Sequence, residues 1–129
     1  MSFNNLATAV LRRYEQSGRI DDLEELISCG REALSLCPLG HPSRSVSLST
    51  FATALCRRYE QLGTTEDLED GITYFREALD LCPVGNLNRF VPLNNLANAV
   101  LLRYGKLGRM EDLAEGITCK HLISALPAA

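Results

Sequence analysis

Apolar side chains recur along the chain at the spacing of one face of an α-helix. The intervals between them are three or four residues, which predicts an amphipathic helix near the start of the chain. The same spacing returns later, so a second helix of this kind is predicted. The positions are Phe3, Leu6, Ala7, Val10, Leu11 and Tyr14 in the first run, and Leu48, Phe51, Ala52, Leu55, Cys56 and Tyr59 in the second.

A glycine and a second apolar run follow each of these helices. Gly18, Gly63 and Gly108 predict the end of the first helix, because glycine accepts the left-handed conformation found there. The next helix opens on acidic residues, which complement the helix dipole. Asp21 or Thr65 is expected to cap its free N–H groups. In the first copy its apolar positions are Leu23, Leu26, Ile27, Ala33 and Leu34.

The chain repeats itself with a period of 45 residues. Residues 4–48 and 49–93 are identical at 24 of 45 positions, and a third copy follows in weaker form. Self-similarity at such a period is typical of stacked helical repeats. No stretch alternates in the manner of a strand. We predict one all-α domain over residues 1–129, a solenoid of three stacked helical hairpins with repeats at about 3–43, 44–88 and 89–126.

The first copy, NNLATAV…G…DLEELI…REALSLCP, resembles the tetratricopeptide repeat. With NNLA, RYEQ, EDLE and REAL, it is similar to the long tetratricopeptide-like arrays of fungal proteins. The resemblance covers essentially the whole chain and implies a right-handed α-solenoid. The period exceeds the family's usual length of about 34 residues. We attribute the excess to one extra turn on each helix and a longer linker. In the third copy, HLIS (His121 to Ser124) replaces REAL.

The resemblance also implies a binding site. First helices of this family line a concave groove that receives a peptide, and an asparagine there both donates and accepts hydrogen bonds to a peptide backbone. A polar row of this kind is equally expected on a helix face that only meets water. The candidate groove residues are Asn4, Asn5, Thr8 and Arg12, then Ser49, Thr50, Thr53 and Arg57, then Asn94, Asn95 and Asn98.

Arginine recurs beside the first-helix tyrosine in every copy, as Arg13, Arg58 and Arg103. Positions that every hairpin shares serve the fold, so we predict that these arginines pair with the acidic start of a neighbouring helix. Arrays of the resembled family that clamp a C-terminal carboxylate carry Lys or Arg early in the first helix. This chain has Asn, Ser or Val at those positions, which disfavours a carboxylate clamp.

The charge and the apolar runs exclude several classes of partner. The net charge is -3 and the basic residues are interleaved with acids, so the chain lacks the basic face of a nucleic-acid binder. The first residues, MSFNNLATAVLRR, are unlike a secretory signal because the basic pair follows the apolar run. Bilayer crossing takes about 20 apolar residues, and no run reaches that length. We expect a cytoplasmic protein that binds neither nucleic acid nor membrane.

Catalytic and metal-binding chemistry has no support in the sequence. None of the five cysteines forms a CxxC pair. Cys37 and His41 have the spacing of metal ligands, but no second pair completes a zinc site. His41 and His121 accompany no nucleophile pattern. We expect no cofactor, no metal and no enzymatic activity.

The sequence therefore predicts a protein–protein interaction scaffold or adaptor that binds a partner peptide or helix in the concave groove. A structural fragment of a longer repeat array, with no ligand of its own, is the alternative. A regulatory domain of a larger protein is a third possibility, by analogy with the fungal arrays. Uncapped solenoid ends would also allow self-association.

Overall fold

The computed structural model describes residues 3–37, 43–82 and 89–126, with side chains for all of these except 3–8 and 43. Over these residues the chain is helical and has no strand, which confirms the all-α class. None of the described helices is both long and apolar enough to cross a membrane. The helices are α1 (Phe3–Ser17), α2 (Ile20–Leu36), α3 (Ser43–Leu62), α4 (Thr65–Asp80), α5 (Phe90–Leu107) and α6 (Met110–Ser124).

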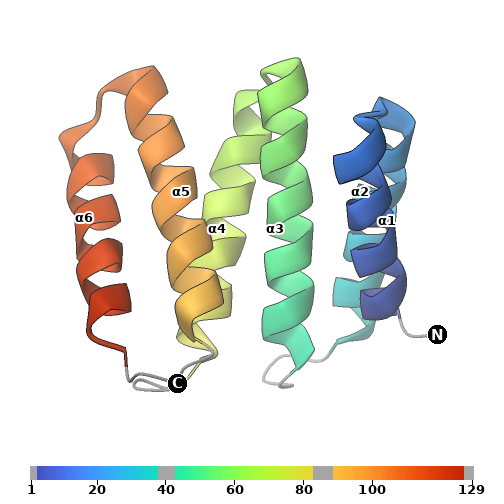
Figure 1. The fold of residues 1–129 in the computed structure, drawn as a ribbon, viewed down its shortest axis with the longest axis horizontal. Coiled ribbons are helices and arrows are strands. Elements are labelled where there is room, and N and C mark those ends of the chain that lie inside the picture. Colours follow the sequence, from blue (N-terminus) through green and yellow to red (C-terminus); the bar gives the residue numbers. More distant parts are fainter. Residues whose placement is uncertain (1–2, 38–42, 83–88, 127–129) are drawn as a thin grey trace.

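The helix pairs stand side by side in a row, with α2 behind α1 and α4 behind α3 and α5, and successive helices run in opposite directions (Figure 1). Two residues connect α1 to α2, α3 to α4 and α5 to α6, and the members of each pair pack against each other. Between pairs, α2 packs on α3 and α4 packs on α5, while α1 touches α3 and α3 touches α5. Packing between neighbours along the chain is what the 45-residue repeat requires.

The turn glycines end the first helix of each pair as predicted. Gly18, Gly63 and Gly108 have φ values of 68°, 73° and 67°, a left-handed conformation that only glycine adopts without steric cost. Each glycine N–H donates a 2.7 Å hydrogen bond to the carbonyl of the tyrosine four residues earlier. This bond satisfies a carbonyl that the helix end would otherwise leave free.

The predicted apolar stripes form the core. All six predicted positions of α3 are buried, with exposed fractions of 0% to 7%. Val10 and Tyr14 of α1 are buried as well, whereas the side chains of Phe3, Leu6 and Ala7 lie outside the described residues. The second-helix prediction is also confirmed, with Leu34 half-buried and full burial of Leu23, Leu26, Ile27 and Ala33.

The starts of the second helices differ from the prediction. α2 begins at Ile20, α4 begins at Thr65, and the residue before each makes no side-chain capping hydrogen bond. The expected caps, Asp21 and Thr65, are therefore wrong. Both lie inside the first turn, and a capping side chain belongs to the residue that precedes it.

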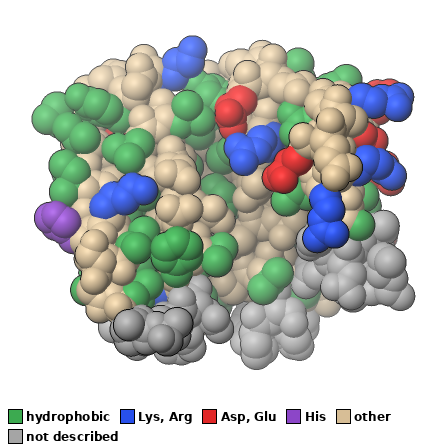
Figure 2. All heavy atoms as spheres, in the orientation of Figure 1, with side chains coloured by type: hydrophobic (Ala, Val, Ile, Leu, Met, Phe, Trp, Pro, Cys, Tyr) green, Lys and Arg blue, Asp and Glu red, His purple; other side chains and the backbone are tan. Residues whose placement is uncertain are grey.

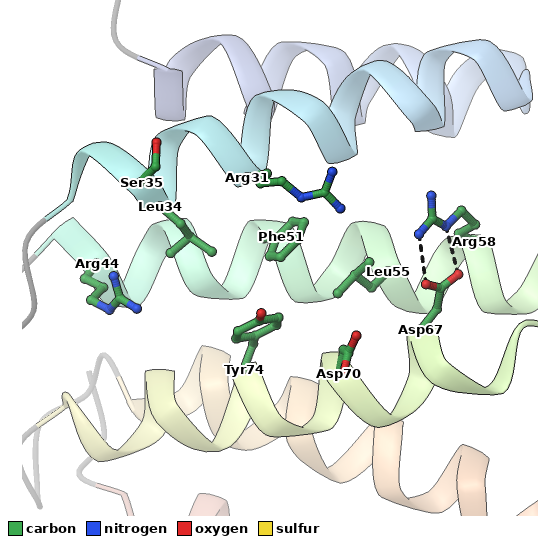
Figure 3. A pocket seen from close by; sticks show the side chains of 10 residues that line it. All are labelled: Arg31, Leu34, Ser35, Arg44, Phe51, Leu55, Arg58, Asp67, Asp70 and Tyr74. Atoms are coloured by element: carbon green, nitrogen blue, oxygen red, sulfur yellow. Dashed lines mark hydrogen bonds and ion pairs between the residues drawn. The ribbon is translucent and has the colours of Figure 1, made fainter.

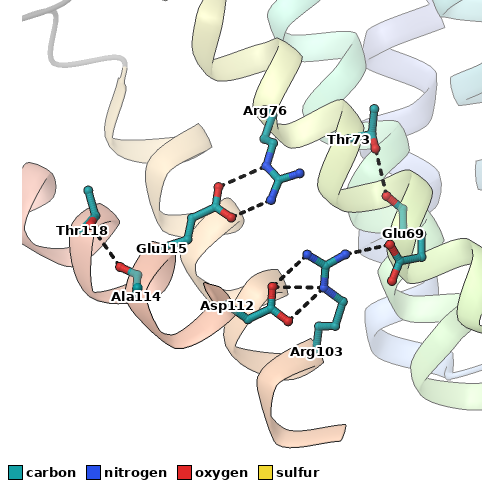
Figure 4. A network of polar contacts seen from close by, with 8 residues as sticks. All are labelled: Glu69, Thr73, Arg76, Arg103, Asp112, Ala114, Glu115 and Thr118. Carbon is teal, nitrogen blue, oxygen red and sulfur yellow. Dashed lines mark hydrogen bonds and ion pairs between the residues drawn. The ribbon is translucent and has the colours of Figure 1, made fainter. Parts of the chain in front are cut away.

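Arg103 of α5 joins three helices. It donates from Nε and Nη2 to Asp112 of α6, at 3.0 and 2.8 Å, and from Nη1 to Glu69 of α4, at 2.7 Å (Figure 4). Arg103 is 8% exposed and Asp112 is 2% exposed, so both charges are buried and each compensates the other. The hydrogen bond to Asp112 raises the pKa of Arg103.

Arg58 of α3 repeats this arrangement one pair earlier. It donates from Nε and Nη2 to Asp67 of α4, at 2.8 and 2.9 Å, and from Nη1 to Glu24 of α2, at 3.1 Å. We call each arginine with its two acids an arginine junction. The predicted pairing with the acidic start of a neighbouring helix is confirmed. The second arm, which reaches back to the preceding helix pair, was not predicted.

The two ends of the row lack this junction. Among the described residues, Arg13 pairs only with acids of its own pair, Asp22 at 3.1 Å and Glu25, and its side chain is 53% exposed. In the third pair, Ala114 stands where the earlier pairs have the glutamate that receives the second arm. The junction thus belongs to the two interfaces between pairs.

Replacing Arg103 with methionine should lower the free energy of unfolding by about 3–5 kcal/mol, because the buried Asp112 loses its partner. Arg13→Met is the matched control at the same repeat position. Its ion pairs are exposed, so a loss below about 1 kcal/mol is expected. Urea denaturation measures both. Equal losses would show that burial does not distinguish the two sites.

Phe51 lies at the centre of the interface between α2 and α3. Its side chain is 5% exposed, and its ring centroid is 5.3 Å from that of Tyr74. Gly30 of α2 faces it so closely that a Cβ there would come within 3.0 Å of the ring. The absence of a side chain at Gly30 therefore lets the two helices meet around Phe51.

Phe51→Ala should lower the free energy of unfolding by about 3–5 kcal/mol, through lost burial and the cavity it leaves. Phe90, which is 49% exposed, supplies the control, and Phe90→Ala should cost much less. Thermal and urea denaturation give both values. A loss below about 1 kcal/mol for Phe51→Ala would contradict the packing of α2 on α3.

Candidate functional site

The predicted groove residues fall on the first helix of each pair. Asn4, Asn5 and Thr8 belong to α1, but their side chains lie outside the described residues. The described remainder is half-buried or exposed, as residues in contact with solvent or a ligand must be. Arg12 and Asn98 are exposed, and the half-buried members are Ser49, Thr50, Thr53, Arg57, Asn94 and Asn95.

A groove of about 260 Å³ between α3 and α5 brings four of these residues together. Thr53 and Arg57 line it from α3, and Asn95 and Asn98 line it from α5. The spacing of each pair, four residues in α3 and three in α5, places both members on one helix face. The other described candidates, Arg12, Ser49, Thr50 and Asn94, do not line this groove.

The groove also contains residues that the sequence prediction missed. Its apolar lining comes from Cys56, Phe75, Ala99 and Leu102, and Glu60 adds a carboxylate. Helical spacing from the predicted positions would have found most of them, since Cys56 and Glu60 follow Thr53 by three and seven residues. Phe75 comes from α4, and no spacing within a first helix could indicate it.

The polar groups of the groove differ in how fully they are satisfied. Thr53 Oγ1 donates to the carbonyl of Ser49 at 2.8 Å, so this hydroxyl is engaged. Arg57 pairs with Glu60 at 2.8 Å, and both side chains are more than 40% exposed. Such a pair contributes about 0–1 kcal/mol and can open for a ligand. Within the described residues, nothing hydrogen-bonds to the side-chain amides of Asn95 and Asn98.

The surface around the groove changes character from one side to the other. In Figure 2, charged side chains gather over α1 and α3, and hydrophobic side chains gather over α5 and α6. The groove lies between α3 and α5, so a ligand in it would meet Arg57 and Glu60 on one side and Ala99 and Leu102 on the other.

The titratable groups of the site do not form reactive chemistry. Desolvation by burial raises the pKa of Cys56 to about 12, so the thiol is protonated at neutral pH and is a poor nucleophile. His121 is exposed on α6, and His41 lies outside the described residues. Among the described side chains, no group of three or more His, Cys, Asp or Glu residues is placed to hold a metal ion.

Comparison with protein-family models, with curated proteins and with solved structures gives no match.

Unfolding in alkali should report the environment of Cys56. The unfolded thiol ionises above pH 9, whereas the folded thiol keeps its proton until about pH 12. The folded state then binds more protons, so the free energy of unfolding falls by about 1.4 kcal/mol per pH unit across this window. Cys56→Ala should lose this part of the slope. Urea unfolding from pH 8 upward gives both curves, and parallel curves would contradict the assignment.

Proposed function

We propose that this protein is an interaction module whose groove between α3 and α5 holds an extended segment of a partner polypeptide. One observation carries the proposal. The groove sets the amides of Asn95 and Asn98, which bond no described residue, above an apolar floor that includes Cys56 and Phe75. Free amides over an apolar floor suit a peptide, whose backbone needs hydrogen bonds and whose side chains need burial.

We also propose the architecture that such a module would use, a right-handed α-solenoid of three tetratricopeptide-like hairpins. Three observations support it. The sequence repeats every 45 residues, the same left-handed glycine closes the first helix of each pair, and the arginine junction recurs at both interfaces between pairs. In a solenoid of this kind the first helices share one surface, where the groove residues lie.

The chemistry of the groove narrows the class of ligand. Asn95 and Asn98 each offer a donor and an acceptor, which matches the alternating groups of an extended backbone. Arg57 favours a partner with an acidic side chain at that end of the groove, since its pair with Glu60 is exposed and easily exchanged.

One observation favours the alternative, in which the chain is a structural part of a longer array. Ile117 is 48% exposed, whereas Ile27 and Ile72, at the same repeat position, are 2% and 0% exposed because the next pair covers them. Met110 and Leu122 of α6 are also exposed. This surface of α6 suits either another helix pair or self-association.

Both versions describe a cytoplasmic protein with a polypeptide partner, or none, rather than an enzyme. The net charge of -3 disfavours nucleic acid and anionic membranes as partners. A regulatory domain attached to a catalytic unit would use the same groove or the same α6 surface.

Selection from a displayed peptide library tests the proposal. The protein should enrich a family of peptides, and the double variant Asn95→Ala/Asn98→Ala should bind them at least about tenfold more weakly, since it loses two amide contacts. Fluorescence anisotropy measures the affinities. Asn94→Ala is the matched control, because Asn94 belongs to the same helix but lies outside the groove.

Two results would contradict the proposal. Failure to enrich any peptide would favour the structural alternative. Equal affinity for the wild type, the double variant and Asn94→Ala would place the binding surface elsewhere on the molecule. Unfolding curves for all three proteins separate lost binding from lost stability.

A further inference from the structure

A second and larger groove, of about 470 Å³, lies between α2 and α4, with α3 as its floor (Figure 3). Phe51 and Leu55 form the floor. Arg31 reaches over it from α2, while Tyr74 and Asp70 face it from α4. Its volume is in the range of pockets that hold small molecules or single side chains. The groove shares no lining residue with the one between α3 and α5.

Two charges in this groove are left without an ionic partner among the described residues. Arg58 is held by its junction, and Arg44 pairs with Glu77 at 2.7 Å. By contrast, nothing in the described structure forms an ion pair or hydrogen bond with Arg31 or Asp70. The guanidinium carbon of Arg31 stands 5.9 Å from the centre of the Phe51 ring, within the range of a cation–π contact.

The same positions in the next repeat show what this arginine lacks. Arg76 and Glu115 correspond to Arg31 and Asp70 after a shift of 45 residues. Arg76 donates from Nε and Nη2 to the Glu115 carboxylate at 3.0 and 2.5 Å, a two-pronged ion pair between α4 and α6 (Figure 4). Asp70 is one methylene shorter and makes no such pair. Arg31 thus has no ionic partner among the described residues at a repeat position where Arg76 has one.

The floor differs between the two repeats in a way that suits a ligand. Phe51 and Tyr74 are replaced in the next repeat by Leu96 and Cys119, and of these four side chains only Tyr74 is more than 5% exposed. In the first repeat the aromatic rings line an open groove, and Tyr74 is only half-buried. An apolar stem in this groove would lie against the Tyr74 ring and meet only the edge of the buried Phe51.

We propose that the groove between α2 and α4 binds a monocarboxylate on an apolar stem. The carboxylate pairs with Arg31 as that of Glu115 pairs with Arg76, and the stem lies on Tyr74 beside the edge of Phe51. A guanidinium that donates hydrogen bonds to both oxygens of a carboxylate makes a strong and directional contact. Asp70 on the opposite wall repels any anion, and it repels a dianion such as phosphate more strongly than a monocarboxylate. The carboxylate is either a glutamate side chain of a partner polypeptide or a free small acid.

Proton NMR of the Phe51 and Tyr74 rings tests this during titration with three probes: pentanoate, glutamate blocked at its α-amino and α-carboxyl groups, and inorganic phosphate. The two carboxylates should shift these resonances saturably and phosphate should not. Tighter binding of the blocked glutamate would identify a polypeptide source, and tighter binding of pentanoate a free acid. Absence of a saturable shift, or a response to phosphate as strong as to pentanoate, would overturn the proposal.

In Asp70→Glu, the longer side chain should place a carboxylate of the protein where it competes with the ligand for Arg31. The substitution lengthens this side chain to match Glu115, so it should pair with Arg31 and weaken pentanoate binding about tenfold. Arg31→Gln should weaken it by at least as much. Asp80→Glu, the same change on the exposed end of α4, is the control and should bind like the wild type. Unchanged affinity in Asp70→Glu or in Arg31→Gln would overturn the proposal.

Discussion

The arginine junctions fix how each helix pair sits on the one before it. A buried guanidinium needs its charge and its N–H groups satisfied together, and Arg103 achieves this only where Asp112 and Glu69 converge. Sliding or rotating one pair on its neighbour would break the contact with the glutamate and leave a desolvated donor. Both grooves depend on this spacing. The groove between α3 and α5 depends on the Arg103 junction, which connects α5 to α4. The groove between α2 and α4 includes Arg58 and Asp67 of the other junction in its wall.

The local features of the fold could be predicted because each copy contains what it needs. Gly63 ends α3 through its own conformation, and the arginine meets an aspartate nine residues later in the same pair. Features that need a neighbour were less predictable. In the sequence, Glu24 resembles an ordinary surface residue. Its contact with Arg58 arises only when the next helix pair packs against α2. Ile117 shares its repeat position with buried isoleucines yet is exposed, because burial depends on what lies beside α6 and not on the residue.

The candidate site shows the same division. The polar row of the first helices was visible from spacing, and four members of it meet in one groove. Phe75 entered that groove from another helix, which only the packing of α4 could reveal. The absence of an ionic partner at Arg31 could not be predicted from the sequence at all. Arg31 and Arg76 have the same sequence context, REAL, and differ because their opposite residues are an aspartate in one repeat and a glutamate in the other.

The series of arginine junctions stops at α6, where Ala114 occupies the position of the glutamate. Each interface takes an arginine from the later pair and a glutamate from the earlier one, but α6 presents a methyl group at that position. At the opposite end, Arg13 donates from Nε to Asp22 and from Nη2 to Glu25. Copies joined end to end would therefore lack the glutamate of the arginine junction. A helix pair added after α6 would pack on it without an arginine junction, unless an acid replaced Ala114.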